Sequence, residues 1–266
     1  MSLPSSPAAP AAPAPAHLPD LRGRTALVTG AGSGIGRAIA LRLAASGAAV
    51  RALDLDADAA GAVARATGGE ALAVDLSDLD AVDALDLDEV DVLVNCAGLQ
   101  HVCPLEEFPP ERFSLMLRIM LEAPFRLVRG ALPGMYRRGW GRIVHVSSVH
   151  GLRASAYKSA YVAAKHGLEG LSKVIAMEGA PHGVTSNCLN PGYVRTPLVE
   201  RQIADQAAVH GISEAEVVEQ VMLERAAVKR LVEPEEIAEA AAFLCTPHTS
   251  AMTGTSLVVD GGWSAR

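Results

Sequence analysis

Three side chains between residues 147 and 167 could together move a proton. Tyr161 and Lys165 are four residues apart, so on a helix they share one face, and Ser148 precedes them at the end of a strand-like run. A phenol with a pKa near 10 is a poor base at neutral pH, but an ammonium group beside it favours the phenolate. The pattern predicts that Tyr161 acts as acid or base, that Lys165 lowers its pKa, and that Ser148 holds a hydroxyl or carbonyl oxygen.

A glycine-rich turn near the N-terminus predicts a dinucleotide site. In "TALVTGAGSGIGRAIA" a β-run enters a turn with glycines at Gly30, Gly34 and Gly36, and a helix follows. This arrangement lets a pyrophosphate approach the N–H groups at the helix N-terminus. Asp54 ends the next β-run, where a carboxylate binds ribose hydroxyls and repels a 2′-phosphate, so it predicts NAD. The alternative is a solvated Asp54 in the acidic segment "DLDAD".

The elements that must position these residues alternate between short apolar β-runs and helix-like stretches. This alternation predicts an α/β fold, a Rossmann-like, doubly wound parallel sheet with helices on both faces. Two of the predicted helices cover about 111–132 and 156–178, and the segment between Asp75 and Val90 has room for two helical turns. Because parallel strands end at one edge of the sheet, the candidate residues should meet there.

Domain boundaries follow from composition. Residues 1–20 form an Ala/Pro-rich segment that predicts a disordered tail, and residues 21–266 form the predicted Rossmann-like domain. Residues 196–231 interrupt the alternation with a polar helical pattern, which predicts a small helical lid over the site or, alternatively, a plain packed helix pair.

Overall composition excludes several classes of protein. The 266 residues are 50% hydrophobic with a net charge of −7, and no basic run or long apolar run is present. These features argue against a nucleic-acid or membrane partner. The four cysteines have no metal-ligand or disulfide spacing, which predicts reduced thiols, no metal and a cytoplasmic protein.

The motifs as a set resemble the short-chain dehydrogenase/reductase family from Leu21 to Trp263. They are T-G-A-G-S-G-I-G at 29–36, V-D-L at 74–76, N-C-A-G at 95–98, Ser148, Tyr161-x-x-x-Lys165 and N-P-G at 190–192. The resemblance implies a homotetramer, and an NAD site that consists of Gly30, Ser33, Gly34, Ile35, Gly36, Asp54, Asp75, Leu76, Asn95, Ala97, Gly98, Tyr161, Lys165, Pro191, Gly192, Val194 and Thr196.

One position departs from the family pattern. Met120 stands where a helix-borne asparagine usually joins the catalytic group. Pro124 has no N–H to donate to the Met120 carbonyl, so we expect that carbonyl to anchor a water for a proton relay through Lys165. The alternative is a slow or altered enzyme.

A third cation indicates the substrate class. Lys158 precedes Tyr161 by three residues, so a helix extending that far would point it into the same cleft, where it would bind a substrate carboxylate. The surrounding sequence resembles the branch of the family that oxidises (R)-3-hydroxybutyrate to acetoacetate. That resemblance implies a substrate site made of Gln100, His150, Lys158, Tyr193, Gln202 and Trp263.

Two other functions remain open on the sequence alone. The first is oxidation or reduction of another small secondary alcohol, a sugar, a polyol or a 3-oxoacyl thioester. The second is a dinucleotide-binding protein without catalysis, which Met120 would favour and the intact Ser148, Tyr161 and Lys165 oppose.

Overall fold

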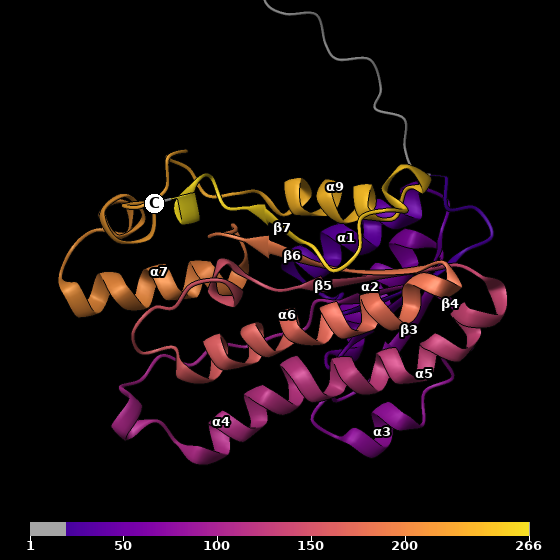
Figure 1. The fold of residues 1–266 in the computed structure, drawn as a ribbon. Coiled ribbons are helices and arrows are strands. Elements are labelled where there is room, and N and C mark those ends of the chain that lie inside the picture. Colours follow the sequence, from indigo (N-terminus) through magenta and orange to yellow (C-terminus); the bar gives the residue numbers. More distant parts are fainter. Residues whose placement is uncertain (1–19, 266) are drawn as a thin grey trace, which may run out of the picture.

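A parallel sheet of seven strands forms the centre of the molecule (Figure 1). The computed structural model describes residues 20–265, without the side chains of 201, 204–206 and 208–210. The strand order is β3-β2-β1-β4-β5-β6-β7, and every pair is parallel. The strands are β1 (Thr25–Thr29), β2 (Ala49–Asp54), β3 (Glu70–Ala73), β4 (Val90–Asn95), β5 (Gly141–Val146), β6 (Val184–Pro191) and β7 (Ser256–Val259). The doubly wound sheet predicted from the sequence is confirmed.

Helices cover both faces of this sheet (Figure 1). One layer contains α1 (Gly34–Ala45), α2 (Ala57–Thr67) and α9 (Pro234–Leu244), and the other contains α3 (Leu79–Asp83), α4 (Pro110–Leu117), α5 (Ala123–Arg138) and α6 (Ser159–Gly179). Every residue of β4, β5 and β6 is buried, because both faces of these central strands are covered. Each layer packs its own apolar cluster against the sheet.

The segment between β3 and β4 is as short as the sequence predicted. Helix α3 has five residues, and the Asp78 carboxylate caps it by accepting hydrogen bonds from the N–H groups of Asp80 and Ala81. The crossover is therefore completed by little more than one helical turn.

Helix α6 begins later than the sequence pattern predicted. It starts at Ser159 rather than near Ala156, because Tyr157 has a φ of 66°, in the left-handed region that ends or precedes a regular helix. The Cys103 N–H donates to the Tyr157 carbonyl at 2.9 Å and fixes this turn. Lys158 consequently precedes the helix that carries Tyr161 and Lys165.

The stretch predicted as one amphipathic helix over 111–132 contains a break in its hydrogen-bond register. A π-helical turn, Arg118–Glu122, separates α4 from α5, and the Ala123 N–H donates to the Arg118 carbonyl five residues earlier. Met120 lies at the centre of this turn.

Residues 196–231 lie beyond the end of the sheet. They include α7 (Pro197–His210), α8 (Glu214–Glu216) and a π-helical turn, Val217–Met222, at the left of Figure 1. A small apolar cluster joins this segment to Val149 and Trp263. Its role as a lid stays a prediction, and the predicted tail lies outside the described residues except for Asp20. None of the described helices combines the length and apolar character of a membrane span.

Candidate active site

A cavity of about 740 Å³ opens at the carboxyl ends of the strands. The segments that follow β1, β2, β3, β4, β5 and β6 all contribute to its lining, as expected for a parallel sheet. The site residues predicted from the sequence that line it are Gly30, Ser33, Gly34, Ile35, Gly36, Asp54, Asp75, Leu76, Ala97, Gly98, Gln100, Ser148, His150, Lys158, Tyr161, Lys165, Pro191, Gly192, Tyr193, Val194, Thr196 and Gln202.

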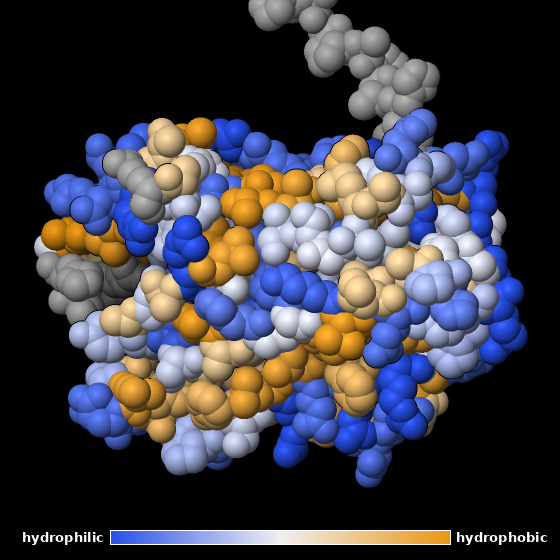
Figure 2. Space-filling view, viewed as in Figure 1, coloured by the Kyte–Doolittle hydropathy of each residue, from blue (hydrophilic) through white to orange (hydrophobic). Residues whose placement is uncertain are grey.

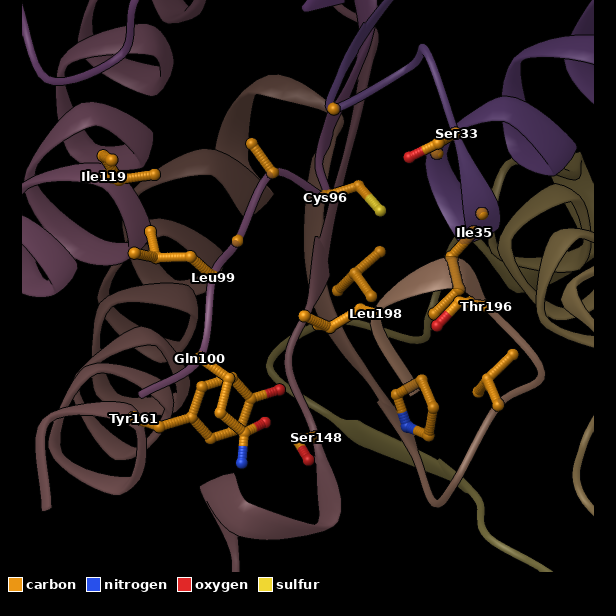
Figure 3. A pocket seen from close by; sticks show the side chains of 18 of the residues that line it. Ser33, Ile35, Cys96, Leu99, Gln100, Ile119, Ser148, Tyr161, Thr196 and Leu198 are labelled. Carbon is orange, nitrogen blue, oxygen red and sulfur yellow. The ribbon is translucent and has the colours of Figure 1, made fainter. Parts of the chain in front are cut away.

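The glycine turn brings backbone close to backbone at one end of the cavity. A Cβ at Gly36 would lie 2.1 Å from the Gly30 carbonyl oxygen, and a Cβ at Gly30 would lie 2.9 Å from the Ala97 Cα. These two glycine positions therefore have no room for a side chain. The side chains of Ser33 and Ile35, which lie between them in the sequence, face the cavity (Figure 3). This cradle fits a pyrophosphate.

Asp54 is held rigidly at the end of β2. One carboxylate oxygen accepts the Gly32 N–H at 2.8 Å and the other accepts the Asp56 N–H at 3.1 Å. The carboxylate lines the cavity beside Leu55, and the described lining contains no arginine there. The geometry suits the hydroxyls of a ribose and disfavours a phosphate at the same position.

Ser148, Tyr161 and Lys165 converge at the other end of the cavity (Figure 3 shows Ser148 and Tyr161). Lys165 Nζ lies 5.5 Å from the centroid of the Tyr161 ring and donates to the Val146 carbonyl at 2.7 Å. Burial raises the pKa of Tyr161 to about 12, while a hydrogen bond from Ser148 lowers it. Burial also lowers the pKa of Lys165 to about 8. The arrangement can transfer a proton to or from an oxygen held by Ser148.

Lys158 reaches the same cavity although it lies outside helix α6. Its Nζ is 5.6 Å from the centroid of the Tyr193 ring, and burial lowers its pKa. No carboxylate pairs with it among the described residues. Gln100 and Gln202 line the same space, so a cation and two amides are available to an anionic ligand.

His150 is buried beside Ser148. Its Nδ1 lies 3.4 Å from Ser148 Oγ, and its Nε2 lies 2.9 Å from Ser155 Oγ. Burial, with a smaller contribution from Lys158, lowers the pKa of His150 to about 4, so the ring is neutral at neutral pH. Its assignment as a carboxylate ligand stays a prediction.

The structure places two predicted site residues away from the cavity lining. Asn95 is buried under it, with its side-chain amide 3.2 Å from His145 Nδ1. Trp263 packs behind His150, with a centroid distance of 5.7 Å between the rings. Asn95 can therefore support the site through its contact with His145, and Trp263 through its contact with His150, without contacting a ligand in the cavity.

Met120 is buried next to the cavity. Its sulfur would lie 3.4 Å from a Cβ at Gly98, so the thioether fills space beside the cofactor-side loop. Pro124 has no N–H for a carbonyl either four or five residues earlier, and the π-helical turn widens the helix at that point. The water bound to the Met120 carbonyl stays a prediction.

Sequence reasoning missed much of the apolar lining. These residues are Leu53, Leu55, Val74, Cys96, Leu99, Leu115, Ile119, Val146, Val149, Pro197, Leu198 and Val199, together with the polar Ser77 and Ser147. Several of these residues directly adjoin the motifs in the sequence, so their position in the cavity could have been predicted. Leu115 and Ile119 come from a separate helical stretch and have no such neighbour. Within the described part of the chain, no cluster of three or more His, Cys, Asp or Glu could hold a metal.

Comparisons with known proteins agree with this geometry. A family model described as enoyl-(acyl carrier protein) reductase matches residues 30–264. The chain is 42% identical to the D-beta-hydroxybutyrate dehydrogenase of Rhizobium meliloti (strain 1021), over 91% of this chain and 99% of that protein. It is 43% identical to the D-beta-hydroxybutyrate dehydrogenase of Cupriavidus necator, over 92% of this chain and 100% of that protein.

A similar solved structure contains a bound dinucleotide. It is a protein of Agrobacterium tumefaciens, provisionally assigned as a 2-deoxy-D-gluconate 3-dehydrogenase, with bound NADP. The match has a TM-score of 0.82 and 34% identity, over 93% of this chain and 98% of that one. Together with the glycine cradle, this similarity supports a dinucleotide cofactor.

Proposed function

As a member of the short-chain dehydrogenase/reductase family the chain is an oxidoreductase, and we propose that it catalyses the reversible, NAD-dependent oxidation of (R)-3-hydroxybutyrate to acetoacetate. The observation that carries the substrate assignment is Lys158, a partly buried cation that lines the cavity without a carboxylate partner in the described chain. Such a cation is costly to bury unless a ligand supplies the opposite charge. The names of the relatives support the same class of substrate.

The proposed mechanism uses the three converging side chains. The substrate carboxylate binds Lys158 with Gln100 and Gln202, which directs the hydroxyl-bearing carbon toward Ser148 and Tyr161. Ser148 donates a hydrogen bond to the substrate oxygen.

Tyr161, as phenolate, takes the hydroxyl proton, and the positive charge of Lys165 stabilises that phenolate. When bound in the glycine cradle, NAD would accept the hydride that leaves the hydroxyl-bearing carbon of the substrate. In the reverse direction Tyr161 returns the proton to the carbonyl oxygen of acetoacetate.

The alternative substrate is a neutral secondary alcohol or a 3-oxoacyl thioester, and relatives named 3-oxoacyl-[acyl-carrier-protein] reductase favour the thioester. The proposal is tested by measuring NADH production from NAD with (R)-3-hydroxybutyrate and with (S)-3-hydroxybutyrate. The same assay is repeated with NADP as the cofactor and with a neutral secondary alcohol as the substrate. Turnover of the R acid with NAD supports it. Turnover of the neutral alcohol alone would contradict the carboxylate site.

Asp54 should decide between the two dinucleotides. Replacing Asp54 by Asn removes the charge that repels a 2′-phosphate, so we expect the NAD preference, measured as the ratio of kcat/KM values for NAD and NADP, to fall about tenfold. Asp56→Asn is the matched control, because Asp56 caps helix α2 and does not line the cavity. An unchanged ratio in Asp54→Asn would show that another residue sets the preference.

The pH dependence of oxidation should follow the ionisation of Tyr161. Burial raises its pKa to about 12 in the chain without cofactor, and we expect the positive charges of Lys165 and an oxidised cofactor to oppose that shift. Below the operative pKa of Tyr161 the phenolate fraction grows about tenfold per pH unit, so kcat/KM for the hydroxy acid should rise between pH 6 and 8, the range in which Lys165, whose pKa burial lowers to about 8, keeps its charge.

Reduction of acetoacetate uses protonated Tyr161 and should not rise over this range. A rate of oxidation that does not change with pH would argue against Tyr161 as the base.

Assembly and location are part of the same proposal. Phe125 on α5 and Val174 and Met177 on α6 are exposed, Met177 by 80%, and apolar residues form a band over this face (Figure 2). Contact with a second copy would cover them, which supports the homotetramer.

The free cysteines support a cytoplasmic location.

A further inference from the structure

Glu169 is a buried acidic residue on the face of helix α6 that packs against the sheet. It is 5% exposed and lies one helical turn after Lys165. Within the described part of the chain it forms no ion pair with a lysine or an arginine. A carboxylate buried without a cation needs hydrogen-bond donors in place of water. The groups that donate to Glu169 therefore indicate what it holds in place.

Two neutral side chains from neighbouring strands donate to this carboxylate. Asn190 Nδ2 on β6 donates to Oε1 at 2.6 Å, and Ser256 Oγ on β7 donates to Oε2 at 2.6 Å. Both distances are short, as in charge-assisted hydrogen bonds. The carboxylate thus joins helix α6 to the last two strands of the sheet.

The Asn190 amide extends this link to Ser148. Its Nδ2 also donates to the Ser148 backbone carbonyl, at 2.9 Å. The carbonyl and the carboxylate are both acceptors, so only the NH₂ group of the amide can face them, and this fixes the orientation of the side chain. Asn190 is fully buried, and its Oδ1 has no hydrogen-bond partner among the described residues. Its amide nitrogen is therefore the group that connects the carboxylate of Glu169 to the backbone of Ser148.

The Ser148 carbonyl in turn fixes the turn that follows β5. It accepts a second hydrogen bond, from the Gly151 N–H at 2.9 Å, which closes the short helical turn Val149–Gly151. Gly151 lies directly against the carboxylate, because a Cβ at this position would be 2.9 Å from Glu169 Oε1. The turn that begins at Ser148 is thus packed and hydrogen-bonded onto the buried acidic group.

We propose that Glu169 is a positioning residue that acts through Asn190: the carboxylate orients the amide, and the amide holds the Ser148 backbone so that the Ser148 hydroxyl keeps its place in the cavity. Asn190 directly precedes Pro191 and Gly192, which line the cavity. The same amide therefore fixes the wall formed at the end of β6 relative to the wall formed after β5. This inference rests on the proposed role of Ser148 in holding the substrate oxygen.

A double-mutant cycle tests the link kinetically. Asn190→Ala removes the amide and leaves Ser148 itself unchanged, so we expect kcat for the preferred alcohol to fall about tenfold with KM within about twofold. Glu169→Leu keeps the volume but leaves the amide without its acceptor, and it should cause a similar loss. Because Glu169 acts through Asn190, the double variant should have the kcat of Asn190→Ala alone. Two independent effects would multiply to a loss of about 100-fold, and that result would overturn the proposal.

Two further variants separate positioning from packing. Glu169→Gln still offers an oxygen to the amide, so it should keep kcat within about threefold of the wild type. Ser172→Ala is the matched control, because Ser172 Oγ lies 2.9 Å from Ser186 Oγ and joins the same helix and strand without contacting Ser148. It should lower Tm but leave kcat unchanged. A loss of kcat in Ser172→Ala equal to that in Asn190→Ala would show that packing between α6 and β6 is responsible, and it would overturn the proposal.

The hold on the turn can also be measured without any substrate. Hydrogen exchange of the Gly151 amide, followed by NMR, should be about tenfold faster in Asn190→Ala than in the wild type, because its acceptor loses an anchor. Exchange should not change in Ser172→Ala. Faster exchange in a protein that does not oxidise the hydroxy acid would support this inference and contradict the proposed substrate. Unchanged exchange of the Gly151 amide in Asn190→Ala would overturn the inference whichever alcohol is oxidised.

Discussion

Replacing Tyr161 by Phe should lower kcat for (R)-3-hydroxybutyrate by about three orders of magnitude, because it removes the group that accepts the hydroxyl proton. The phenol lies in the cavity beside Ser148 and Lys165, and its ring packs in an apolar cluster with Met116 and Ala160, so Phe should keep the fold. KM and NADH binding, followed by nicotinamide fluorescence, should change little. The loss should therefore fall on the chemical step.

Tyr136 offers a control for this substitution. It stacks on His182 with a centroid distance of 4.1 Å and does not line the cavity. Tyr136→Phe should therefore retain full activity. If Tyr161→Phe kept a tenth of the wild-type kcat, another residue would have to accept the hydroxyl proton.

The second large effect is expected at Lys158. Lys158→Ala should lower kcat/KM for (R)-3-hydroxybutyrate about 100-fold, the size of a lost charge-assisted hydrogen bond, mostly through KM. A neutral secondary alcohol has no carboxylate to lose, so its kcat/KM should change less than about threefold. The ratio of the two effects measures the interaction with the carboxylate.

Two variants sharpen this experiment. Lys173 is an exposed lysine of helix α6 that does not line the cavity, so Lys173→Ala removes a positive charge away from the site and should have no effect. Lys158→Arg keeps the charge and should recover part of the affinity. Equal losses for the acid and the neutral alcohol in Lys158→Ala would contradict the carboxylate assignment and favour the alternative substrates.

The sheet could be predicted because its signals are local. Apolar runs such as 90–95 and 141–146 alternate with helical stretches, and the structure confirms the parallel, doubly wound architecture. The π-helical turn Arg118–Glu122 could not be predicted, since its hydrophobic pattern continues from one helix into the next. The left-handed backbone conformation of Tyr157 could not be predicted either, because nothing in the sequence indicates that conformation for a tyrosine.

The candidate site was predictable to the extent that strand ends define it. Gly30 and Ser148 follow β1 and β5, Asp54 is the last residue of β2, and the sheet brings all three to one cavity. The Ser155 contact depends on a three-dimensional turn around His150, so spacing alone could not reveal it. Trp263 was placed in the pocket by resemblance; in the structure it does not line the cavity, and it packs against His150 and in the apolar cluster with Val149 and Tyr193.

The strand order also affects how the chain can fold during synthesis. β1 pairs with β2 on one side and β4 on the other, so the first strand made becomes an inner strand and the sheet grows outward from it. All strands that frame the glycine cradle are complete by Asn95, before β5 and α6 have left the ribosome. A nascent chain can thus assemble its nucleotide-binding half first, and β5, β6 and β7 then add in sequence along one open edge.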